Sequence, residues 1–79
     1  MNDVFANYVR DLGFELKALA QDAKEAKESS VEQGDRLYQT GHLMGLHEAV
    51  SLMLQQAKAF GISAEDVGLA GIDPDRDFL

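Results

Sequence analysis

The run from Gly41 to Phe60 has the periodicity of an amphipathic helix, yet it carries apolar residues on two sides. Plotted at about 100° per residue, one set of apolar side chains covers an arc of roughly 160°. This set is Leu43, Leu46, Ala49, Val50, Met53, Leu54, Ala57 and Phe60. A narrower patch lies nearly opposite and consists of Tyr38, Gly41, Gly45 and Leu52. Because one stripe is enough for one contact, this helix is expected to pack against more than one neighbour.

A second long helix is predicted upstream, over residues 2 to about 29. Its apolar residues recur at alternating intervals of four and three, which is a heptad stripe. The stripe consists of Phe5, Val9, Leu12, Leu16, Leu19, Ala23 and Ala26. Asn2 or Asp3 can cap the start of this helix. A short connection to the next helix, predicted over about 31–60, makes the two helices an antiparallel hairpin.

The connection between the helices can be drawn in two ways. Ser29 with Glu32, or Ser30 with Gln33, fits a capping box, so that one serine would be the N-cap of the second helix. Alternatively, Gly34 ends the first helix and Asp35 caps the second. We prefer the serines because the capping box is a two-residue signal. Gly61 then ends the second helix.

A short third helix is predicted over about 64–70. Ser63 can serve as its N-cap, with Asp66 as the capping-box acid and Gly71 as the terminating glycine. We expect Val67, Leu69 and Ile72 to dock on the open end of the hairpin, beside Phe5 and Val9.

The last residues, 73–79, begin with alternating aspartates, as a calcium-binding loop does. The match fails, because Phe78 stands where that loop requires glycine and no glutamate follows at its twelfth position. We therefore expect an Asp-Pro turn followed by a solvated acidic tail.

The 79 residues are expected to form one all-α domain, residues 1–79. A chain of this size has a small core and usually needs disulfides, a metal or a partner subunit. There is no cysteine, so disulfides and thiolate metal sites are excluded. We therefore predict a homodimer in which two hairpins form a four-helix bundle with the second helix inside. The predicted interface residues are Tyr38, Gly41, Gly45, Leu52 and Phe14.

A formal net charge of −7 argues against binding to nucleic acid or anionic membrane, since both require clustered Lys and Arg. It permits a basic protein partner. No run approaches the roughly 18 apolar residues of a membrane span, and the N-terminus starts polar and acidic, unlike a signal peptide. We expect a cytoplasmic protein.

Chemistry-bearing residues are few. His42 and His47 are five apart and fall on different sides of a helix, at the two edges of the apolar stripe. Ser51 lies one turn from His47, but the sequence supplies neither an acid to orient the imidazole nor an oxyanion hole. We expect no catalysis and no cofactor, and instead a small interaction protein such as a regulator or inhibitor. The alternative is a metal- or ligand-binding bundle that uses His42, His47 and Glu48.

Overall fold

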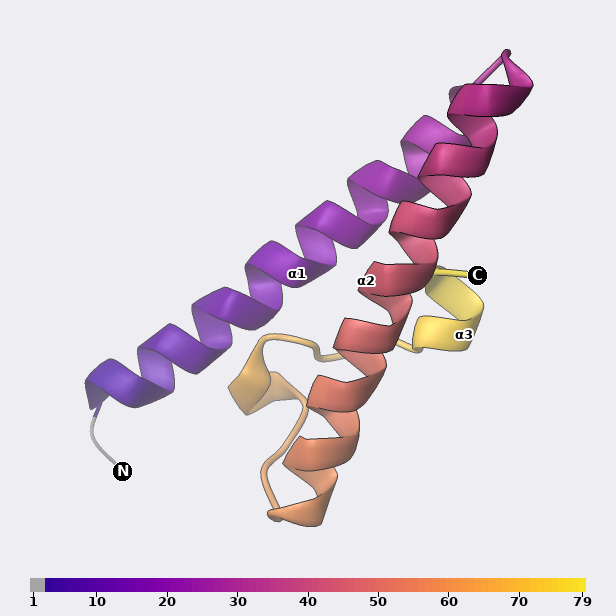
Figure 1. The fold of residues 1–79 in the computed structure, drawn as a ribbon. Coiled ribbons are helices and arrows are strands. Elements are labelled where there is room, and N and C mark those ends of the chain that lie inside the picture. The colour runs from indigo at the N-terminus through magenta and orange to yellow at the C-terminus, as the bar shows by residue number, and fades with distance from the viewer. Residues whose placement is uncertain (1–2) are drawn as a thin grey trace.

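The computed structural model describes residues 3–79, and every regular element in that range is helical. Two long helices, α1 (Asp3–Ser29) and α2 (Gln33–Ala59), run antiparallel as a hairpin (Figure 1). A 3-10 turn, η1 (Glu65–Val67), and a one-turn helix, α3 (Pro74–Asp77), follow. The predicted all-α hairpin with a short C-terminal helical element is confirmed. The expected start and cap at Asn2 lie outside the described residues.

The turn between the long helices differs from both sequence predictions. Glu32 is the N-cap of α2, and its side chain makes no capping hydrogen bond. The serine hydroxyls instead donate back into α1, Ser30 Oγ to Ala26 O at 2.6 Å and Ser29 Oγ to Glu25 O at 2.9 Å. Carbonyls in the last turn of a helix lack amide partners, so the serines satisfy the end of α1 rather than the start of α2. Gly34 lies inside α2, so the chain does not break there.

The end of α2 is fixed by Gly61, as predicted. This glycine adopts a left-handed φ of 71°, which costs glycine little. Its N–H donates to Lys58 O at 3.1 Å, and the Ile62 N–H donates to Ala57 O at 2.8 Å. These two bonds form a Schellman motif, which turns the chain back along the hairpin.

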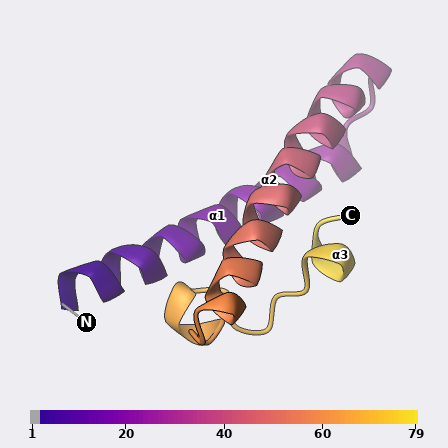
Figure 2. The ribbon, with the colours of Figure 1, turned by 60° about the horizontal axis from the view of Figure 1, so that its bottom comes forward.

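Residues 62–79, called here the C-terminal segment, cover one face of the hairpin. In Figure 1 the segment passes from η1 behind α2 to α3, and Figure 2 shows the same path from another side. The Ser63 hydroxyl accepts from the Asp66 N–H at 3.1 Å, as the capping prediction required. The predicted helix over 64–70 is nevertheless wrong in length. Gly68 takes a left-handed φ of 75° and ends the turn after Val67.

The last residues are not a solvated tail, and that prediction is corrected. Asp73 caps α3 by accepting from the Asp75 and Arg76 N–H groups, while its own N–H donates to the Asp77 carboxylate at 2.9 Å. Phe78, immediately after this turn, is only 1% exposed. Burying a phenylalanine stabilises a fold by roughly 1.5–3 kcal/mol, which gives the acidic end of the chain a reason to dock.

The core lies between the hairpin and the C-terminal segment. Its buried side chains are Ala20, Ala23, Leu43, Val50, Ala57, Val67, Leu69 and Phe78. The fully buried residues of α1 are all small, so the segment and α2 can approach this helix closely. The predicted heptad stripe of α1 is partly wrong, because Phe5, Leu12 and Leu19 are exposed. The buried face of α1 is rotated toward Gly13 and Ala20, and the two helices diverge toward the N-terminus of α1 (Figure 1).

Candidate protein interaction surface

Basic residues line the side of α1 on which the C-terminal segment packs. Arg10, Lys17 and Lys24 recur at seven-residue intervals and therefore share one side of α1. The C-terminal segment carries five acidic residues and one basic residue, and it packs on that side. Lys24 Nζ donates to the Asp77 carbonyl at 2.9 Å. Opposite charge on the helix and the segment thus supports docking on this face.

The second helix holds the same segment through a histidine. His47 Nε2 lies 2.8 Å from Asp75 Oδ1, and the His47 side chain is only 18% exposed. This is the hydrogen bond expected of a histidine at the rim of a core. With the Lys24 contact on α1, it places α3 against both long helices.

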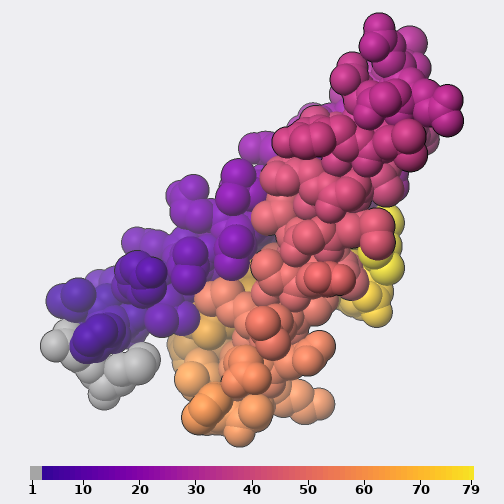
Figure 3. All heavy atoms as spheres, viewed as in Figure 1, coloured from indigo at the N-terminus to yellow at the C-terminus, as the bar shows by residue number. Residues whose placement is uncertain are grey.

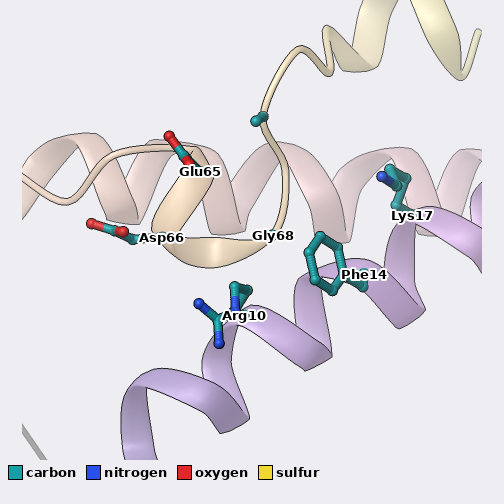
Figure 4. Close-up of a pocket in the computed structure, with 7 residues that line it drawn as sticks. Arg10, Phe14, Lys17, Glu65, Asp66 and Gly68 are labelled. Atoms are coloured by element: carbon teal, nitrogen blue, oxygen red, sulfur yellow. The ribbon is translucent and has the colours of Figure 1, made fainter. Parts of the chain in front are cut away.

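Further along the segment, the backbone itself approaches α1. A Cβ on Gly13 would clash with the Val67 carbonyl oxygen, and a Cβ on Gly68 would clash with the Arg10 carbonyl oxygen. Phe14 lies beside this crossing and is half-exposed, with Lys17 Nζ 5.4 Å from its ring centroid. Figure 4 shows Arg10 and Phe14 beneath the loop that carries Gly68.

The opposite face of the hairpin, which we call the open face, is not covered by the C-terminal segment. It comprises Tyr8, Leu12 and Leu19 of α1 and Tyr38, Gly41, Gly45 and Leu52 of α2. All seven residues are exposed. The α1 row lies away from the Arg10–Lys24 row, and the α2 row lies away from His47, so both rows point to one side. Figure 3 views this side, where α3 emerges only at the edge.

Four of the five predicted interface residues therefore lie together on the open face. A Cβ built on Gly41 or Gly45 would have open space around it. Within residues 3–79, no atom lies within 4 Å of it except those of the adjacent residues and of the surrounding helix backbone. The fifth residue, Phe14, lies on the side of the C-terminal segment and is not brought together with the other four.

The candidate ligand residues do not converge. His42 stacks on Tyr38, with ring centroids 6.1 Å apart, whereas His47 turns toward Asp75. Glu48 is exposed. Across residues 3–79, no group of three or more His, Cys, Asp or Glu side chains is placed to hold a metal.

Sequence reasoning missed Asp75 as the partner of His47. Ser51, His47 and Asp75 line one shallow hollow, which superficially resembles a nucleophile, base and acid. The 2.8 Å contact between His47 and Asp75 joins α2 to α3. The His47–Asp75 pair is therefore accounted for as an anchor for α3. The two residues are 28 positions apart, and no local pattern links them.

The sequence also placed Leu12 and Leu19 in the core rather than on the open face. The signal that could have indicated this is that apolar residues of α1, Tyr8 among them, extend beyond the heptad stripe.

No helix in the described part of the chain is long and apolar enough to cross a membrane. The sequence matches no family model, and neither the curated proteins nor the solved structures compared with it gave a match.

Proposed function

We propose that this is a non-catalytic protein that acts through protein–protein contacts, and that its first partner is a second copy of itself. Two hairpins pack open face to open face, as a four-helix bundle with α2 inside. The observation that supports this most directly is the open face itself, an exposed apolar surface formed by both long helices. Exposed apolar patches of this kind mark interaction sites.

The size of the molecule supports a dimer of this kind. Its radius of gyration is 13.8 Å, against about 11.6 Å for a compact domain of this length. Its accessible surface is 5510 Å², against about 4,700 Å² for a compact monomer of this mass. The excess of about 800 Å² is close to what each partner buries in an interface of standard size.

The charge of the two helices supports an inner position for α2. Only four of its 27 residues are Asp, Glu, Lys or Arg. The equally long α1 has ten. Charged residues are depleted at the centres of interfaces, so α2 has the composition of a helix that is covered on both sides.

Light scattering coupled to gel filtration tests the proposal. The unaltered protein is expected at the mass of a dimer. Leu52→Glu and Leu12→Glu place a charge on the open face, and each is expected to shift the protein to a monomer while the circular dichroism stays helical. Ala18→Glu adds the same charge to an exposed position outside the open face, and it should leave the dimer intact. An unaltered protein that stays monomeric at high concentration contradicts the proposal.

A further inference from the structure

An apolar groove opens where the two long helices diverge. It is lined by Val9 of α1, by Met53 and Ala57 of α2, by Phe60 just after α2, and by Ile62 and Val67 of the C-terminal segment. Its volume is about 190 Å³, which is room for a small aliphatic group. Apart from Gln56 at the edge, every lining side chain is apolar. Filling such a groove with an apolar group is favourable, because it removes apolar surface from water.

The other end of the molecule carries an apolar residue that no other part of the chain covers. Val31, in the turn between α1 and α2, is 97% exposed, the largest exposed fraction among the large hydrophobic residues described. Leu37, in the second turn of α2, is also exposed. The molecule is 47 Å long, so the turn cannot reach the groove of its own chain.

Distances along α2 relate the turn to the groove. At 1.5 Å per residue, α2 starts about 15 Å before Leu43, with Val31 two residues further out, and Gln56 lies about 20 Å after Leu43. A two-fold axis at the level of Leu43, perpendicular to the helices, therefore exchanges the two ends of the hairpin. In such a symmetric pair, each end contacts the opposite end of the other copy.

We infer that the two copies of the dimer run antiparallel, so that the turn of each copy, with Val31, covers the groove of the other. This inference rests on the proposed dimer and adds its orientation. The other symmetric arrangement sets the two turns side by side and leaves both grooves open. The antiparallel arrangement covers Val31 and the groove at once, and it does so twice per dimer.

Single cysteine substitutions can determine how the two copies are oriented, because the chain has no cysteine of its own. Val31→Cys and Gln56→Cys proteins are unfolded, mixed in equal amounts, refolded together and mildly oxidised. Mass spectrometry then separates the mixed disulfide from the two homodisulfides. Because the antiparallel pair brings residue 31 of one copy to residue 56 of the other, the mixed species should exceed either homodisulfide by about tenfold or more. Ala18→Cys, mixed with Gln56→Cys in the same way, is the matched control and should give no such excess.

The outcomes separate the orientation from the dimer itself. A predominance of the Val31→Cys homodisulfide, or a dimer by light scattering with no excess of the mixed species, overturns the antiparallel orientation and leaves the proposed dimer standing. A monomer by light scattering overturns both. An excess of the mixed disulfide in a protein of dimer mass supports both.

Discussion

Gly13 of α1 and Gly68 of the C-terminal segment meet at a backbone crossing that leaves no room for a side chain on either residue. A Cβ on Gly13 would clash with the Val67 carbonyl oxygen, and one on Gly68 would lie 2.9 Å from the Phe14 nitrogen. Gly68 also needs its left-handed φ. This crossing fixes how far along α1 the segment docks.

Gly13→Ala is therefore expected to destabilise the protein, although alanine is the better helix former. The helical preference favours alanine by about 1 kcal/mol, but the atoms that a Cβ meets are backbone and cannot move aside alone. We expect a net loss of about 1–3 kcal/mol, the usual cost of overpacking. Urea denaturation followed by circular dichroism measures it. Gly34→Ala is the control, since a Cβ there has open space, and it should be neutral or stabilising by up to about 1 kcal/mol. Equal effects at the two sites would refute the close crossing.

Phe78→Ala should cost about 3–5 kcal/mol of unfolding free energy, because the side chain is fully buried and its removal leaves a cavity. For a chain of this size that loss can unfold the protein, so Phe78→Leu is a milder second variant. It should cost less than about 1.5 kcal/mol and remain measurable. The adjacent Leu79, which is exposed, serves as the control, and Leu79→Ala should change stability by less than about 0.5 kcal/mol. Similar losses at positions 78 and 79 would mean that the end of the chain is not docked.

Asp77 should titrate at an unusually low pH. A side-chain hydrogen bond from Arg76, with a second from the Asp73 N–H, lowers the pKa of the Asp77 carboxyl from 3.8 to about 2. A pKa that is lower in the folded state contributes stability above pH 3.8, and that contribution is lost as the pH falls toward 2. NMR titration of the Asp77 carboxyl carbon measures the pKa directly. Arg76→Gln should raise it toward its ordinary value, whereas Arg36→Gln should leave it low. An ordinary pKa for Asp77 in the unaltered protein would rule out the capped α3.

His47 and Asp75 should be coupled weakly. Their atoms are 2.8 Å apart, but the Asp75 side chain is 81% exposed, and exposed pairs contribute at most about 1 kcal/mol. A double-mutant cycle with His47→Gln and Asp75→Asn should give a positive coupling energy below about 1 kcal/mol. The same cycle with Glu48 in place of His47 should give none, since Glu48 lies on the other side of α2. A coupling of zero for both pairs would show that His47 does not anchor α3.

The helical fold could be predicted from local sequence patterns. These patterns predicted a helix end correctly where a single residue determines it. Gly61 ended α2 as predicted, because a left-handed glycine closes the Schellman bonds without strain. The serine hydroxyls had two possible sets of partners, the preceding carbonyls and the following amides. Sequence alone does not choose between them, and they bonded backward.

The C-terminal segment was misjudged because its binding site is built by distant parts of the chain. Phe78 follows an acidic stretch, which is typical of a solvated tail. Its burial depends on small residues such as Ala20 on α1, and on Lys24 and His47 as anchors. Because the segment packs on another side of α1, Leu12 and Leu19 lie on the open face and not in the core where the sequence placed them.

The contacts of the C-terminal segment also separate folding into an early and a late stage. The turn of the hairpin closes over a few residues, whereas the bond from Lys24 to Asp77 spans 53 positions. Closing a long loop costs more conformational entropy, so the hairpin is expected to form first and the segment to lock onto it last. The reverse route starts at the same place, and local opening should begin with α3 while α1 and α2 remain paired.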